Sequence, residues 1–297
     1  MKKTLAMMTA AMMVAGALAG CGSSSSTRAA TTAAATEAAT TAAATEAATT
    51  EAAGDTAAAA EGTVKTPSGK FTVGFDQEFP PMGFVGDDGQ FTGFDLDLAK
   101  EVASRLGLEF VPQPINWDAK DMELDSGNID CIWNGFTMQG REDDYTWVGP
   151  YMANNQVFVV TADSDIASKA DLAGKAVEVQ KDSSGLAALQ GEAELSASFG
   201  SMTEVADYNT ALMDLESGAC DAVCMDSIVA GYQIKSSGKD MKILDDTLSA
   251  EEYGIGFKKG EDELAKAVQD TLMEMKDDGT VAKISNDWFG SDVFTLK

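Results

Sequence analysis

The chain has 297 residues, and its 48 acidic residues outnumber the 21 basic ones, which gives a formal net charge of -27 at neutral pH. This acidic balance argues against nucleic-acid binding, because Lys and Arg must neutralise phosphate groups in such interfaces. The sequence has no histidine, which excludes a histidine-based catalytic triad and a histidine-ligated zinc site. We therefore expect no nucleic-acid partner, no metal site and no cofactor.

Residues 1–20 have the pattern of an export signal. Lys2 and Lys3 precede an apolar run over residues 5–18, and small residues lead to Cys21. The run is shorter than the roughly 20 apolar residues that span a bilayer, and the small residues favour cleavage before Cys21. The leader resembles that of bacterial lipoproteins, which implies that Cys21 carries acyl chains such as palmitate. The alternative is an ordinary secretory leader followed by a cysteine by chance.

Residues 21–62 are rich in Ser, Ala, Thr and Glu and lack the large apolar side chains that build a core. Burial there cannot offset the roughly 1 to 2 kcal/mol per residue that ordering a backbone costs. We predict a disordered tether with a root-mean-square reach of about 35 Å. Such a tether would let a folded domain swing above a membrane.

Beyond residue 62, predicted strands and helices alternate. A strand over 70–75 is followed by a proline-containing loop over 76–82 and a hairpin over 84–94. Asp95 is the expected N-cap of a helix that Gly107 ends.

Two later stretches, 123–131 and 214–222, repeat one order of features. In each, a helix ends at a glycine in the left-handed cap position, and an aspartate precedes a buried strand. This duplication indicates two similar α/β lobes.

Near the carboxyl terminus, an amphipathic stripe of Leu264, Val268, Leu272 and Met275 predicts a helix. A closing helix over 281–289 is predicted to follow it.

Three cysteines, Cys131, Cys220 and Cys224, lie in apolar runs that predict strands, where a free cysteine behaves as a small hydrophobe. On one strand, Cys220 and Cys224 would lie roughly 13 Å apart, too far for a disulfide. We therefore expect no redox or metal role for these thiols.

A series of motifs, none decisive alone, runs in order from about residue 71 to residue 290. They are Val73-Gly74-Phe75-Asp76, Phe79-Pro80-Pro81-Met82, Gly93-Phe94-Asp95-Leu96-Asp97-Leu98-Ala99, Asp130-Cys131-Ile132-Trp133-Asn134-Gly135-Phe136-Thr137 with Arg141, Pro150-Tyr151, Asp221-Ala222-Val223-Cys224-Met225-Asp226 and Gly254-Ile255-Gly256-Phe257-Lys258-Lys259-Gly260. Together they resemble the amino-acid-binding lipoproteins of bacterial ABC importers, in the polar amino-acid branch (family 3) of the solute-binding proteins.

The resemblance implies a two-lobe, periplasmic-binding-protein-like α/β fold, with two crossover strands as the hinge and a ligand cleft between the lobes. Carried over, lobe 1 comprises residues 63–156 and 251–297, and lobe 2 comprises residues 157–250. It also implies a monomer, lipid-anchored on the extracytoplasmic face of the cell membrane. Such a protein captures a polar L-amino acid by closing its cleft and delivers it to ABC permease subunits.

A free amino acid has a carboxylate and an ammonium that must both find partners in a closed cleft. Arg141 is the candidate for the carboxylate, since a guanidinium binds a carboxylate through two parallel hydrogen bonds. The alternative is a surface arginine paired with Glu142 or Asp143. The spacing from Thr137 to Arg141 is one residue shorter than is usual in the family.

Ser183, Ser184 and the Gly185 amide resemble the family's hydroxyl-rich turn at the start of a helix, where N–H groups favour an anion. The simpler interpretation is a helix N-cap, and one serine can serve both purposes. Asp182 replaces a glycine common in the family and brings a negative charge near the carboxylate.

Asp226 matches the family's acid for the α-ammonium, assisted by the Gly135 backbone and the Thr137 hydroxyl. The alternative is an aspartate that only caps the following helix. For the ligand side chain, the candidate pocket residues are Asp76, Phe79, Trp117, Asn134 and Gln180. This set suits glutamine, cystine or a basic amino acid, and the Asp76 carboxylate argues against an acidic side chain. Phe79 and Trp117 could instead belong to the core.

Two other functions fit the same fold. A few related enzymes, such as dehydratases of cyclic acids, would need a general acid or base such as Glu78 in the cleft. A tethered sensor would use the same cleft to present a ligand to a receptor. We favour the importer component and expect no catalytic residues.

Overall fold

The computed structural model describes residue 66 and residues 68–297. The predicted leader, Cys21 and the tether over residues 21–62 lie outside the described residues. Among the residues described, no helix is both long enough and apolar enough to cross a membrane.

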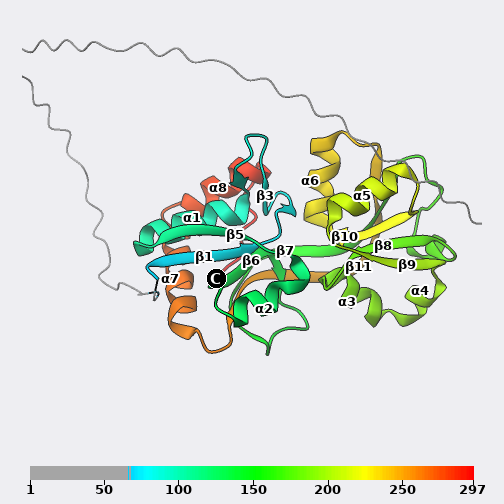
Figure 1. Cartoon of the computed structure of the whole chain (residues 1–297). Coiled ribbons are helices and arrows are strands. Elements are labelled where there is room, and N and C mark those ends of the chain that lie inside the picture. Colours follow the sequence, from blue (N-terminus) through cyan, green and yellow to red (C-terminus); the bar gives the residue numbers. More distant parts are fainter. Residues whose placement is uncertain (1–65, 67) are drawn as a thin grey trace, which may run out of the picture. The chain divides into compact units, whose positions relative to one another are not determined.

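Strands and helices alternate along the described chain (Figure 1). The strands are β1 (Lys70–Phe75), β2 (Glu78–Phe79), β3 (Gly83–Val85), β4 (Phe91–Thr92), β5 (Glu109–Pro114), β6 (Cys131–Thr137), β7 (Tyr145–Thr161), β8 (Ala176–Gln180), β9 (Ser201–Val205), β10 (Ala222–Asp226) and β11 (Met241–Lys258). The α-helices are α1 (Phe94–Leu106), α2 (Lys120–Asp125), α3 (Ser184–Gly191), α4 (Ala193–Ser198), α5 (Tyr208–Ser217), α6 (Ser227–Ser237), α7 (Asp262–Asp277) and α8 (Thr280–Phe289). Short 3-10 helices lie at Trp117–Ala119 and Lys169–Leu172.

An eight-stranded sheet has the order β5-β1-β6-β11-β7-β10-β8-β9. Strand β1 pairs in parallel with β5 and β6, and β8 pairs in parallel with β9 and β10. The long strands β7 and β11 are antiparallel to each other; β11 also pairs with β6, and β7 with β10. They therefore connect the β1 end of the sheet, here called lobe 1, to the β8 end, here called lobe 2 (Figure 1). The predicted two-lobe α/β fold with two crossover strands is confirmed.

The predicted glycine helix ends are confirmed. Gly107 (φ 70°) follows α1 and Gly218 (φ 78°) follows α5, each in the left-handed conformation, which glycine adopts without a Cβ clash. The predicted apolar stripe of α7 is buried, because it packs toward the core while the charged face of the helix stays in water.

The prediction that Asp95 caps α1 is wrong. The N-cap is Gly93 (φ 142°), and Asp95 lies fully buried in the first turn. A Cβ on Gly93 would lie 2.2 Å from the Met82 carbonyl oxygen, so the backbone passes too close for any side chain. The Asp95 carboxylate instead accepts hydrogen bonds from the Gly135 N–H (2.7 Å) and the Tyr151 hydroxyl (2.8 Å). Asp95 therefore positions the backbone of β6 at Gly135.

The cysteines Cys131, Cys220 and Cys224 are free and buried, as predicted. Cys220 precedes β10 instead of lying in it, so the prediction that it shares a strand with Cys224 is wrong. The chain enters β10 after Asp221, whose carboxylate accepts a hydrogen bond from the Ala176 N–H (2.8 Å). Burial raises the pKa of the Cys220 thiol to about 12 and raises the pKa of the other two thiols well above their ordinary value.

Candidate functional site

A small cavity, partly open to solvent, lies where the two lobes meet. Its lining residues are Phe79, Trp117, Gly135, Thr137, Arg141, Gln180, Ser183, Ser184 and Asp226. All of them are predicted ligand residues. Lobe 1 contributes the end of β2, the 3-10 helix before α2, and β6 with its following loop. Lobe 2 contributes the end of β8, the start of α3 and the end of β10.

The structure places the other three predicted residues beside the cavity instead of on its wall. The Asp76 backbone N–H donates to Asn134 Oδ1 (3.0 Å), and Asp76 Oδ2 accepts from Gln180 Nε2 (2.7 Å). Asn134 is fully buried. A Cβ on Gly185 would lie 2.7 Å from Gln156 Oε1, so a larger residue there would displace the Gln156 side chain. Asp76, Asn134 and Gly185 thus support the residues that line it.

Arg141 lines the cavity. Its Nη1 donates to the Thr137 carbonyl oxygen (3.2 Å), and its guanidinium carbon lies 5.1 Å from the centre of the Phe136 ring. The Trp147 indole N–H donates to the Arg141 carbonyl oxygen (3.1 Å) and fixes the loop. None of the ion pairs formed within residues 68–297 includes Arg141. The alternative pairing with Glu142 or Asp143 is therefore not formed, and the guanidinium can accept an anion.

The start of α3 lies at this cavity as well. Ser183 is its N-cap, and Ser183 Oγ accepts from the Leu186 N–H (3.1 Å). Ser184 Oγ accepts from Gln156 Nε2 (3.1 Å). The two interpretations of these serines coexist, because both residues also line the cavity. Helix N–H groups that point toward it favour a negatively charged group.

Asp226 is the buried acid of the site. Its Oδ1 accepts from Asn154 Nδ2 (2.7 Å) and from the Tyr253 hydroxyl (2.7 Å), and its Oδ2 accepts from the Tyr208 hydroxyl (3.1 Å). It stands at the N-cap position of α6, but its side chain makes no capping hydrogen bond, so the alternative of a simple cap is not formed. Burial, with the Glu251 carboxylate nearby, raises the pKa of Asp226 to about 8.

Sequence reasoning missed the supporting residues of Asp226. Asn154 lies on β7, and its Nδ2 also donates to Glu251 Oε1 on β11 (2.6 Å). Gln156 donates to the same oxygen (2.9 Å). Polar side chains at buried positions of two long strands are the signal that could have indicated this network.

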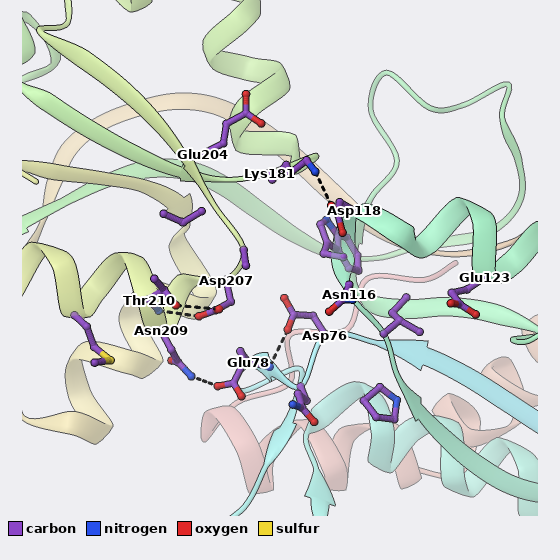
Figure 2. A pocket seen from close by; sticks show the side chains of 17 residues that line it. Asp76, Glu78, Asn116, Asp118, Glu123, Lys181, Glu204, Asp207, Asn209 and Thr210 are labelled. Carbon is purple, nitrogen blue, oxygen red and sulfur yellow. Dashed lines mark hydrogen bonds and ion pairs between the residues drawn. The ribbon is translucent and has the colours of Figure 1, made fainter. Parts of the chain in front are cut away.

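Two aromatic rings form opposite walls. The rings of Phe79 and Trp117 are nearly parallel (7°), with centroids 6.5 Å apart. Since carbon atoms make optimal contacts at about 3.5 to 4 Å, a group held between two rings needs about 7 to 8 Å, so the two rings stand too close for a group to lie between them in this arrangement. Asp76 and Trp117 also line a larger groove (Figure 2), and Asp76 accepts a hydrogen bond from Gln180 of the cavity wall (2.7 Å). Burial raises the pKa of Asp76 to about 6.

Several further contacts join the lobes. Lys181 Nζ lies 2.6 Å from Asp118 Oδ2, and Asn209 donates to Glu78 across the groove (Figure 2). Asp182 pairs with Lys120, a residue that sequence reasoning missed. The charge of Asp182 is therefore matched by a lysine and does not stand unopposed near Arg141.

The fold and the cavity define a two-lobed α/β binding protein in which one guanidinium and one carboxyl group line a small cavity. The model of the bacterial extracellular solute-binding proteins, family 3, matches residues 71–291, and the chain belongs to this family. It is a substrate-binding protein of the transport type and not an enzyme.

Curated relatives and solved structures agree with this assignment. The L-cystine-binding protein TcyJ of Escherichia coli (strain K12) is 32% identical over 231 residues, which cover 76% of this chain and 84% of that protein. The L-cystine-binding protein TcyA of Bacillus subtilis (strain 168) is 32% identical over 229 residues, which cover 76% of this chain and 83% of that protein. An ABC uptake transporter substrate-binding protein from Streptococcus pneumoniae with bound histidine has a TM-score of 0.74 and 34% identity, covering 77% of this chain and 96% of that one.

Proposed function

We propose that this chain is the extracytoplasmic component of an ABC importer that captures a polar L-amino acid in the cleft and delivers it to membrane permease subunits. The observation that carries the proposal is that a guanidinium, that of Arg141, and a buried carboxyl group, that of Asp226, line one small cavity. A zwitterion is the ligand class that satisfies both groups at once. The relatives named above, which are titled as cystine-binding and histidine-bound proteins, support it.

In this proposal the α-carboxylate binds Arg141 and the start of α3, where Ser183 and Ser184 offer hydroxyls. The α-ammonium binds Asp226, with the Thr137 hydroxyl and the Gly135 backbone as further partners. The side chain then contacts the Phe79 and Trp117 rings, which line the same cavity. This orientation leaves no charged head group of the ligand without a partner.

The far end of the side chain meets the Asp76–Gln180 pair. Asp76 is 6% exposed and has a pKa of about 6, so it is mostly ionised at neutral pH and favours a cation. We therefore propose an L-amino acid whose side chain ends in a cationic group. L-Arginine ends in such a group. L-Cystine brings a second ammonium together with a second carboxylate, and L-histidine is cationic when its imidazole is protonated.

Asp76→Asn is expected to weaken binding of L-cystine, L-histidine or L-arginine by about 10- to 100-fold, because a hydrogen bond to a charged group contributes roughly 1.5 to 3 kcal/mol. L-Glutamine, which has no distal charge, should lose less than about threefold. Calorimetric titration of both proteins with these four amino acids and L-glutamate measures the effect.

Glu204→Gln is the matched control, because Glu204 is an exposed acid that lines the same groove without contacting Gln180. Equal losses for L-glutamine and the cationic ligands in Asp76→Asn would contradict the assignment of Asp76. Absence of binding by all five amino acids to the unaltered protein would contradict the proposed function itself.

We also propose the predicted anchor and lobe limits for this chain. Residues 1–20 are removed, Cys21 is lipidated, residues 21–62 form the tether, and the mature monomer is held on the outer face of the cell membrane. The lobes are residues 63–156 with 251–297, and residues 157–250.

Cys21→Ser is expected to release most of the protein from the membrane fraction, because the thiol that would carry the lipid is gone. Immunodetection in membrane and soluble fractions measures the change, and Cys220→Ser, which removes a buried thiol, is the control. Retention of the Cys21→Ser protein in the membrane fraction would contradict lipid anchoring.

A further inference from the structure

Lys120 and Asp182 face each other across the cleft. Lys120 is the first residue of α2 in lobe 1, and Asp182 lies between β8 and α3 in lobe 2. Lys120 Nζ donates to Asp182 Oδ2, to the Asp182 carbonyl oxygen (3.2 Å) and to the Trp117 carbonyl oxygen (3.4 Å). Two of its three acceptors thus belong to the opposite lobe.

Lys120 is only 1% exposed in this arrangement. A buried ammonium is unfavourable unless it is paired and hydrogen-bonded, and burial accordingly lowers the pKa of Lys120 while Asp182 opposes that shift. When the lobes separate, Asp182 leaves and water takes its place. The complete hydrogen-bonded set of Lys120 therefore exists only in the closed cleft.

The backbone of Asp182 has a conformation that favours glycine. Its φ of 56° is the only positive φ of a non-glycine residue in the described part of the chain. This conformation is unfavourable for a residue with a Cβ, although aspartate tolerates it better than most. It directs both the carbonyl oxygen and the carboxylate of Asp182 to the same lysine.

We propose that the Lys120–Asp182 ion pair holds the closed cleft and thereby sets how long the ligand stays bound. Lys120 is a positioning residue: its Nζ lies 5.3 Å from the centre of the Trp117 ring, and Trp117 forms a wall of the cavity. Closure through Lys120 thus fixes that wall against the ligand. The proposal rests on the proposed function for its ligand but depends on no particular side chain of that ligand.

The Lys181–Asp118 pair provides a matched control. It also joins the two lobes (2.6 Å), but both of its side chains are exposed (56% and 40%), whereas in the proposed pair Asp182 is 51% exposed and Lys120 only 2%. An ion pair in water contributes little. It should therefore hold the cleft far less than the buried lysine does.

The test uses three variants of the pair: Asp182→Asn, Lys120→Met and the double variant that combines these two. They are compared with the control variant Asp118→Asn, and every protein also carries Cys21→Ser. Spin labels at K100C in α1 and K235C in α6, two exposed positions, report the distance between the lobes. L-Cystine is the probe, and stopped-flow displacement measures its dissociation rate.

We expect Asp182→Asn and Lys120→Met to speed dissociation of L-cystine at least about tenfold and to broaden the distribution of distances between the labels toward those of an open cleft. Asp118→Asn should change the dissociation rate less than about twofold. The double variant should release L-cystine no faster than either single variant, because both substitutions remove the same interaction.

Dissociation and label distances in Asp182→Asn that equal those of the parent protein would overturn the proposal. Failure of the proposed function is distinguishable, because the parent protein would then bind none of the five amino acids, and a parent that binds another of them but not L-cystine is tested with that amino acid. In that event, amine methylation read by mass spectrometry decides without a ligand. Lys120 should react more slowly than Lys266, whose side chain is 74% exposed, and Asp182→Asn should remove this protection. Equal Lys120 reactivity in both proteins would refute the pair.

Discussion

Arg141→Ala is expected to weaken amino-acid binding by about two to four decades. Removing one partner of a buried charge pair costs roughly 3 to 5 kcal/mol, and each decade corresponds to about 1.4 kcal/mol. Arg141 has no competing carboxylate partner in the part of the chain that the structure describes, so its loss acts on the ligand and not on an internal ion pair. Arg141→Lys should recover only part of the affinity, because a lysine lacks the two parallel donors.

Calorimetric titration with L-cystine and L-histidine measures these losses. Arg105→Ala is the control, since Arg105 pairs with Glu101 and Asp278 and does not line the cavity. It should lower the thermal stability and leave the dissociation constant unchanged. Unchanged affinity in Arg141→Ala would refute the carboxylate assignment.

The affinity is also expected to fall as the pH is lowered from about 8 to about 6. The pKa of Asp226 is about 8, so over this range its carboxyl is increasingly protonated when no cation faces it. An ammonium binds the ionised form, and binding must therefore release the proton. The affinity should fall by up to about tenfold per pH unit below the pKa.

The unliganded protein should show the opposite trend in its free energy of unfolding. The pKa of Asp226 is higher in the folded than in the unfolded chain, so the folded state binds the proton more tightly. Its contribution to stability is fully present near pH 4 and is lost as the pH rises through about 8. Asp76 and Asp95, with pKa values of about 6 and 7, act in the same direction.

Calorimetry at pH 7 in two buffers of different ionisation enthalpy measures the proton release, which should approach about one per ligand. Asp226→Asn should abolish the release and weaken binding by about two decades or more. Tyr253→Phe removes a hydrogen-bond donor to Asp226 Oδ1. The pKa of Asp226 should therefore rise, and the loss of affinity should begin at a higher pH. Asp95 faces Gly135 and Tyr151 instead of the cavity, so a release that survives in Asp226→Asn would assign the proton elsewhere and contradict the prediction.

The elements and the cavity wall were predictable because their signals are local. A glycine after a helix, as at Gly107 and Gly218, needs only the chemistry of its own turn. The lining residues were found by their places in ordered motifs. The remaining features depend on contacts between distant segments. Asp95 looked like a cap, and only the approach of Met82 to Gly93 shows why it cannot be one.

The contact between Lys120 and Asp182 was also not predictable from local sequence patterns. They are 62 residues apart, and they meet only because the lobes close. Asp182 was noticed as an unusual residue near the carboxylate site, but its partner lies on the other lobe and leaves no local pattern. The polar residues of β7 and β11 were likewise hidden, because their partner Asp226 belongs to a third strand.

The burial of the cysteines has a consequence for a ligand that itself contains a disulfide. Thiol–disulfide exchange begins with attack by a thiolate on a sulfur atom that it can reach. Cys131, Cys220 and Cys224 are enclosed, and burial raises the pKa of each thiol. Within the described residues, L-cystine would therefore meet no thiolate able to attack its disulfide. The protein could release L-cystine with this disulfide intact.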